Sequence, residues 1–263
     1  MKSVSETHWF LSFTIFGAFV VVLPSCKHGH GGGGGGGGAT YTPGGGETAA
    51  VASSDATTDY TISQTATTLE QEVLDEMNFA RQNPSQYITD RLNPELTNPY
   101  DTSSTYLATL QELINEMQSM SPIGALTWSG RLKQSCTEWV TIQGAGTTAE
   151  DHGHDPNLFN RIRKYCTSYD IAGENLSYGY RKQDSNGNWT DEADPKQIVI
   201  GLLVDDGIAD RGHRYNILDY ATKGKDSAGK FTHAGVSIGT HGYYTTMCAI
   251  NYAGTGSGFV EKP

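Results

Sequence analysis

The sequence lacks any concentration of positive charge. Its 18 lysines and arginines are outnumbered by 29 aspartates and glutamates, which gives a formal net charge of −11 at pH 7. No stretch of the chain holds a basic patch of five or more lysines and arginines. Because nucleic acids and other acidic polymers are bound through basic surfaces, the charge balance argues against them as partners.

Cysteine is also scarce. Besides Cys26, the chain contains only Cys136, Cys166 and Cys248, and no two of the four are spaced as C-x-x-C. One disulfide with a free thiol and three buried reduced cysteines are both compatible with the last three. The H-E-x-x-H motif of zinc proteases is absent as well.

The longest apolar run lies near the start of the chain, at residues 10–23. At about 14 residues it is too short for a permanent membrane span but fits the core of a signal peptide. It ends in Leu23-Pro24-Ser25-Cys26, which resembles the bacterial lipobox, although Pro24 departs from the usual small or aliphatic residue. We therefore predict a lipoprotein-type signal peptide at residues 1–25 with Cys26 as the lipidated residue. An ordinary signal peptide, with Cys26 an incidental thiol, is the alternative.

Residues 26–67 are rich in glycine, threonine, serine and alanine and are almost devoid of large aliphatic side chains. No core can form from that composition, so we predict a flexible tether. About 40 residues of random coil would set a folded domain tens of ångströms from its anchor. Together with the lipobox, the tether predicts an exported protein of the cell envelope that is attached to a membrane through its N-terminal lipid, and is otherwise secreted.

Apolar spacing in the rest of the chain predicts alternating helical and extended segments. Helices are expected from Thr68 to just before Pro84, over residues 104–120 and 129–143, and from the N-cap Asp194 to a stop at Gly207. Two strands at residues 233–239 and 243–252 should pair antiparallel around a short turn. The tail at residues 254–263 is expected to be loose.

The helix that starts at Asp194 should place Asp205 and Asp206 in its last turn. That end of a helix dipole is negative and favours cations by roughly 0.3–1 kcal/mol per charge. Something positive should therefore lie nearby, and the candidates are Arg211, His213 and a metal ion. Solvated acids at a helix end are the alternative.

Three phrases resemble motifs of one family. They are the segment M-N-F-A-R-Q-N-P-S-Q-Y at residues 77–87, the phrase A-G-E-N-L at residues 172–176, and G-H-R-Y-N-I-L at residues 212–218. In this order they resemble the CAP superfamily of cysteine-rich secretory proteins, antigen 5 and pathogenesis-related proteins. The resemblance covers residues 68–253 and implies an α+β fold, the CAP-type α-β-α sandwich with a small mainly antiparallel sheet between helical layers.

The resemblance also implies a binding cleft. It would be lined by His152 or His154, by Glu174, by Asp205 or Asp206, and by His213. Two imidazoles and two carboxylates suit zinc or another divalent cation, with His154 and His213 as the expected metal ligands. The first hypothesis is thus a membrane-tethered, non-enzymatic binding module for a metal or a small lipid-like or cell-envelope ligand.

A metal-dependent hydrolase that uses the same residues is the alternative. Its candidate catalytic residues are Glu174 and His213, with Glu174 or the aspartate at the helix end as general base. A third reading is a structural surface protein whose cleft is vestigial. The sequence identifies no protein partner.

Overall fold

The computed structural model of the chain describes residues 20–22, 62–169, 171–219, 231–254 and 259–262. It contains a five-stranded sheet in the order β1-β4-β8-β7-β2 and two small two-stranded sheets, β3-β9 and β5-β6. The strands are β1 (Val20–Val22), β2 (Thr127–Trp128), β3 (Cys166–Ser168), β4 (Ile171–Tyr178), β5 (Arg181–Gln183), β6 (Trp189–Ala193), β7 (His233–His241), β8 (Thr245–Gly254) and β9 (Val260–Glu261). The predicted α+β class is confirmed.

Helices make up most of the remaining structure. They are α1 (Thr68–Gln82), α2 (Pro84–Tyr87), the π-helix η1 (Ile88–Leu92), α3 (Asn93–Thr97), α4 (Ser104–Gln118), α5 (Gly130–Gly144), α6 (Leu158–Tyr165), α7 (Pro195–Val204) and α8 (Gly212–Leu218). Within the described residues, no helix is both long and apolar enough to cross a membrane.

The longer helices begin where a side chain caps them. Thr67 accepts a hydrogen bond from the backbone N–H of Glu70, and the Glu70 carboxylate accepts one from the backbone of Thr67. This capping box lies one residue earlier than the predicted start at Thr68. Ser103, Ser129 and Asp194 cap α4, α5 and α7 through the same kind of contact.

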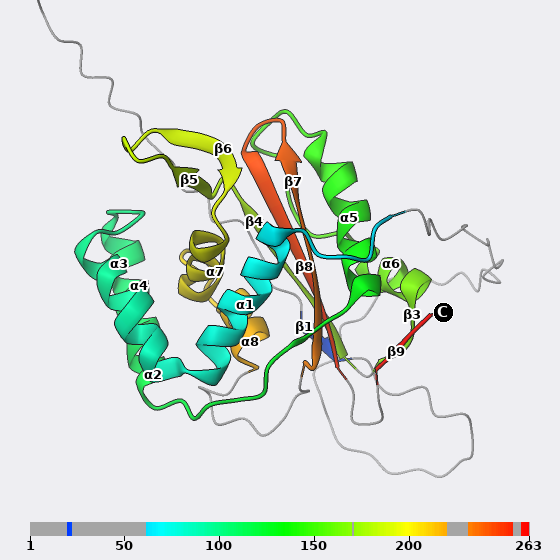
Figure 1. The fold of residues 1–263 in the computed structure, drawn as a ribbon, viewed down its shortest axis with the longest axis horizontal. Coiled ribbons are helices and arrows are strands. Elements are labelled where there is room, and N and C mark those ends of the chain that lie inside the picture. Colours follow the sequence, from blue (N-terminus) through cyan, green and yellow to red (C-terminus); the bar gives the residue numbers. More distant parts are fainter. Residues whose placement is uncertain (1–19, 23–61, 170, 220–230, 255–258, 263) are drawn as a thin grey trace, which may run out of the picture.

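Figure 1 shows the five-stranded sheet between two groups of helices. α5 and α6 lie on one side, and α1, α7 and α8 lie on the other, where α4 packs against α7. Side chains of β8 alternate between the two sides, as the period of a strand requires. Cys248 and Ile250 belong to the larger core beneath α1 and α7, whereas Met247 and Ala249 pack with Cys136 of α5.

α5 lies unusually close to the sheet at Gly235 of β7. A Cβ atom at this position would lie 2.1 Å from the backbone nitrogen of Lys133 in α5. Only glycine permits that approach, because any side chain would overlap the helix backbone. The close contact sets the depth at which α5 lies on β7 and β8.

The pairing of β7 with β8 is antiparallel, as predicted, with His241 opposite Thr245. The turn, however, occupies residues 242–244, two positions later than expected. The ring of His241 explains the shift, because its Nδ1 accepts hydrogen bonds from the backbone N–H groups of Tyr243 and Tyr244. These turn amides thereby gain the partner that a tighter turn would have supplied from the backbone.

The two ends of the chain contribute short strands. Val20–Val22, which lies inside the predicted signal peptide, pairs with β4 at Ile171–Gly173 as the edge strand β1. The tail is less loose than expected, since Val260–Glu261 pairs with β3 and Lys262 accepts a hydrogen bond from Arg131 through its backbone carbonyl. Cys26, residues 27–61 and the rest of the predicted signal peptide lie outside the described residues.

Cys136, Cys166 and Cys248 are all buried and none forms a disulfide with another. Of the two arrangements compatible with the sequence, the structure has three reduced cysteines.

Candidate functional site

The end of α7 explains the acids that the sequence places there. The helix stops at Val204, and Asp205 adopts the left-handed conformation with φ of 56° as its C-cap. The prediction that Gly207 stops this helix is therefore wrong by two residues. Aspartate tolerates the left-handed region better than most residues do, and Arg214 satisfies the carbonyls of Leu203 and Val204.

The carboxylate of Asp205 faces the start of α8 rather than its own helix. It accepts hydrogen bonds from the backbone N–H of His213 at 2.9 Å and from that of Arg214 at 3.4 Å. Its other oxygen lies 2.7 Å from Nδ1 of the His213 ring. Of the candidate partners for this acid, His213 contacts its carboxylate, together with backbone amides.

Asp206, in contrast, points away from His213. Its two oxygens accept hydrogen bonds from the hydroxyl groups of Thr105 and Thr109 in α4. The two neighbouring aspartates therefore have different roles: Asp205 orients His213, and Asp206 attaches the loop to α4.

Glu174 of β4 is the second buried carboxylate among the predicted site residues, with none of its surface exposed. One of its oxygens lies 2.9 Å from Nδ1 of His154, and the other lies 2.5 Å from Nη2 of Arg161 and accepts a hydrogen bond from Nδ2 of Asn251 at 3.0 Å. Burial by itself raises the pKa of Glu174, but the hydrogen bond from His154 and the charge of Arg161 outweigh it and leave the pKa below its ordinary value. Glu174 is therefore held ionised.

These two carboxylates bring two imidazole rings face to face. The rings of His154 and His213 are stacked, with centroids 5.9 Å apart and planes 25° apart. Only 12% of the His154 side chain and 7% of the His213 side chain are exposed. A carboxylate that accepts from Nδ1 favours the tautomer in which Nε2 carries the lone pair, the form that accepts a proton or a metal ion.

His152 lies outside this arrangement. Its ring packs edge-on against Tyr178 and Tyr244, with centroid distances of 6.2 Å to each. The residue between the two histidines, Gly153, has φ of 130°, a conformation that L side chains rarely adopt. The structure thus places His154, and not His152, beside His213.

Asn175 acts from the opposite side of β4 and was not among the predicted site residues. Nδ2 of Asn175 donates to the backbone carbonyl of His213 at 3.0 Å, and Asn216 of α8 donates to Oδ1 of Asn175 at 2.8 Å. Successive strand residues point to opposite faces, so Glu174 holds His154 from one side while Asn175 holds the His213 backbone from the other. Strand periodicity within the A-G-E-N-L phrase is the signal that could have shown this.

Residues 235–239 read G-V-S-I-G and match the letters of the serine-hydrolase motif G-x-S-x-G. That motif requires a sharp turn between a strand and a helix, which exposes the serine. Here Ser237 is buried within β7, and its hydroxyl oxygen accepts a hydrogen bond from Thr137 at 3.0 Å. The match is therefore one of sequence only.

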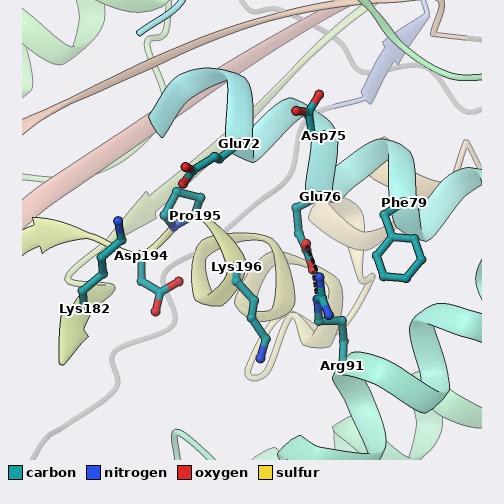
Figure 2. Close-up of a pocket in the computed structure, with 9 residues that line it drawn as sticks. All are labelled: Glu72, Asp75, Glu76, Phe79, Arg91, Lys182, Asp194, Pro195 and Lys196. Carbon is teal, nitrogen blue, oxygen red and sulfur yellow. Dashed lines mark hydrogen bonds and ion pairs between the residues drawn. The ribbon is translucent and has the colours of Figure 1, made fainter. Parts of the chain in front are cut away.

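A hollow of about 410 Å³ lies elsewhere, between α1, η1, β5 and the start of α7. Figure 2 shows the side chains that line it. Its lining consists mostly of charged side chains: Glu72, Asp75, Glu76, Phe79, Arg91, Lys182, Asp194, Pro195 and Lys196. Glu76 and Arg91 form an ion pair at 2.7 Å, with Arg91 over the ring of Phe79. None of the predicted site residues lines this hollow.

The structure thus brings together four of the six predicted cleft residues, namely His154, Glu174, Asp205 and His213. Among the described residues, no group of three or more histidine, cysteine, aspartate or glutamate side chains is arranged to hold a metal ion. Comparison of the chain with protein-family models, with curated proteins and with solved structures found no match.

Proposed function

We propose that this chain is an extracytoplasmic CAP-type binding module, tethered to a membrane of the cell envelope, whose ligand site is built around His154 and His213. The observation that carries the proposal is the stacked pair of imidazoles, each oriented through Nδ1 by its own buried carboxylate. Burying the carboxylates of Glu174 and Asp205 costs desolvation free energy. A fold is therefore not expected to orient two separate rings in this way without a functional reason.

The arrangement of the elements supports the finer fold assignment. A mainly antiparallel sheet with helices on both faces is what the CAP-type α-β-α sandwich requires. The three phrases that carry the resemblance also meet in space. Asn175 of the A-G-E-N-L phrase contacts His213 and Asn216 of the G-H-R-Y-N-I-L phrase, and Arg81 of the first phrase donates to the carbonyl oxygen of Ile217.

A divalent cation fits the donor set of this site. Each carboxylate already accepts from an Nδ1 atom, so the two Nε2 atoms would be the protein ligands and the carboxylates would orient them. Imidazole nitrogen suits zinc better than magnesium or calcium, which prefer oxygen ligands. An ion bound by two protein nitrogens would leave its other positions to water or to an oxygen atom of the small lipid-like or cell-envelope ligand.

The predicted N-terminal segment would keep this site close to a membrane. A lipid on Cys26 and the tether at residues 26–67 would hold the domain near a membrane surface, where a lipid-like or cell-envelope ligand is available. The proposed ligand class depends on this anchor and on the family resemblance.

The alternative, a metal-dependent hydrolase, is less well supported by the contacts of Glu174. Both of its oxygens are engaged and its pKa is lowered, whereas a general base works best with a pKa near the operating pH. Both oxygens of Asp205 are likewise engaged, by His213 and the backbone N–H of Arg214, which leaves an imidazole as the better base for a hydrolase at this site.

Zinc analysis tests the proposal. The full chain, stripped with a chelator and re-equilibrated with zinc at pH 7, should retain about one ion. His154→Ala and His213→Ala should each lose it, because each removes one of two nitrogens. His28 and His30 of the tether can bind metal themselves, so all proteins should carry alanine at those two positions.

His152→Ala is the matched control, since it removes a histidine two residues from His154 that does not face His213. It should retain zinc at the unmodified level. If the parent protein binds no zinc, or if all three alanine variants retain it equally, the metal-binding proposal is wrong.

A further inference from the structure

One face of α4 contacts the segment that carries Asp205 and His213. Its four polar residues, spaced by four, three and four positions, are Thr105, Thr109, Glu112 and Glu116, and we call them the α4 stripe. At this spacing they lie along one side of the helix. The threonines bind Asp206, and the glutamates bind Arg211 and Arg214.

Glu112 is the member of the stripe that contacts both arginines. Its Oε2 lies 2.9 Å from Nη2 of Arg211, and its Oε1 lies 2.9 Å from Nη1 of Arg214. The two arginines are separated in sequence only by Gly212 and His213. Glu112 therefore binds the side chains of two residues that lie on either side of His213 in the sequence.

Arg211 connects Glu112 to the backbone of Asp205. Its Nη1 donates to the carbonyl oxygens of Asp205 and Ile208, both at 2.8 Å. The loop that these contacts close has a non-glycine residue in the left-handed conformation at each end, Asp205 with φ of 56° and Arg211 with φ of 53°. Such a backbone persists only where surrounding contacts hold it.

Arg214, which lies in α8, binds the backbone just before Asp205. It is fully buried, and its Nε and Nη2 donate to the carbonyls of Leu203 and Val204, the two residues before Asp205. Asp205 is thus fixed from both directions by arginines that share one glutamate, and its carboxylate in turn fixes the ring of His213.

We infer that Glu112 is a positioning residue for the ligand site: through Arg211 and Arg214 it holds Asp205, and through Asp205 it sets the orientation and tautomer of His213. The role in ligand binding rests on the proposed function of the imidazole pair. The effect on the His213 ring does not, because it follows from the contacts of the chain alone.

The test uses Glu112→Gln in the full chain. Glutamine keeps the size of the side chain but offers one carbonyl oxygen and no charge to two arginines. In the metal-free protein, long-range ¹H–¹⁵N spectra of the histidine rings should show His213 losing its single Nδ1–H tautomer. Zinc affinity should fall by up to about ten-fold, the lower end of the loss caused by removing a direct partner of a metal ligand, because Glu112 acts on His213 through Asp205.

Two controls separate positioning from general damage. Glu72→Gln changes an exposed helical glutamate that has no ion pair among the described residues, and it should alter neither readout. The ring of His241, whose Nδ1 accepts two backbone hydrogen bonds, should keep the opposite tautomer in Glu112→Gln. A change at His241 equal to that at His213, with a matching fall in Tm, would mean a structural role and overturn the inference.

An unchanged His213 spectrum and unchanged zinc affinity in Glu112→Gln would also overturn it. If the parent protein binds no zinc, the proposed metal function fails by itself, and the spectrum of His213 still decides the role of Glu112.

Discussion

Oδ1 of Asp205 lies 2.7 Å from Nδ1 of His213, although Asp205 ends α7 and His213 belongs to the first turn of α8. The second oxygen of the same carboxylate accepts from the backbone of His213. One side chain therefore fixes both the start of a helix and the ring that the helix presents. Asp206, the next residue, accepts hydrogen bonds from the hydroxyl groups of Thr105 and Thr109 in α4.

Replacing each aspartate by asparagine should separate these roles. Asp205→Asn removes charge from a buried set of hydrogen bonds and should lower the free energy of unfolding by about 2 kcal/mol. Asp206→Asn keeps one acceptor oxygen, and its Nδ2 can donate to the oxygen of the other threonine hydroxyl, so it should cost about 0.5 kcal/mol or less. Urea unfolding at pH 7 measures both values. Equal losses in the two variants would contradict the assignment of Asp205 as the structural acid.

Local rules predicted the starts of helices well but not the choice between neighbouring residues. The N-cap Asp194 is a local feature, visible in sequence because a capping side chain contacts a residue only three positions away. The choice between Asp205 and Asp206 depends on which residue turns left-handed, and that depends on Arg214, which reaches back from the next helix.

The choice between His152 and His154 could not be made from spacing for a similar reason. A single glycine with positive φ separates them and sends their rings to different neighbours. Arg161 was missed because α6, which carries it, was not predicted. Contacts between segments far apart in sequence decided most of the site, and these follow from packing rather than from local periodicity.

Acid should weaken the fold through Glu174. The pKa of Glu174 is lowered in the folded protein. When the pH falls below the ordinary pKa of 4.5, this carboxylate is therefore protonated in the unfolded chain but still ionised in the folded chain. The stability contributed by Glu174 is therefore fully present above about pH 4.5 and is lost as the pH falls through the lower folded pKa. Unfolding free energies from pH 7 to pH 3 should show this decline.

Glu174→Gln should lack that part of the decline. It should be less stable than the parent protein at pH 7, because glutamine offers one neutral acceptor oxygen where the Glu174 carboxylate accepts hydrogen bonds from His154, Arg161 and Asn251. The difference between the two proteins should then shrink with acidification. A difference that stays constant down to pH 3 would contradict the lowered pKa.

The contact between α5 and β7 predicts a strong effect at Gly235. A Cβ atom there would lie 2.1 Å from the backbone of Lys133, which cannot move without shifting the whole of α5. Gly235→Ala should lower the free energy of unfolding by about 3 kcal/mol, the upper part of the range for overpacking. Gly124→Ala is the matched control, since a Cβ there would meet nothing within 4 Å. Thermal unfolding should show the control within a few degrees of the parent and Gly235→Ala well below it.

The three cysteines of the domain should be unreactive while the protein is folded. Burial raises the pKa of all three thiols, that of Cys166 to about 12. At pH 8, a thiol with that pKa is ionised to about one part in ten thousand, and only the thiolate attacks a disulfide reagent. Ellman's reagent should therefore react with none of them within minutes under native conditions.

The same reagent in guanidinium chloride tests the predicted anchor. Unfolding should release Cys136, Cys166 and Cys248 together, because none is in a disulfide. The sequence contains four cysteines, so the fourth equivalent reports Cys26. Protein purified from the membrane fraction should release about three thiols if Cys26 carries a thioether-linked lipid, and Cys26→Ala should then release the same number from the soluble fraction. A fourth reactive thiol in the membrane-derived protein would contradict lipidation, whereas fewer than three would mean that the buried cysteines are oxidised.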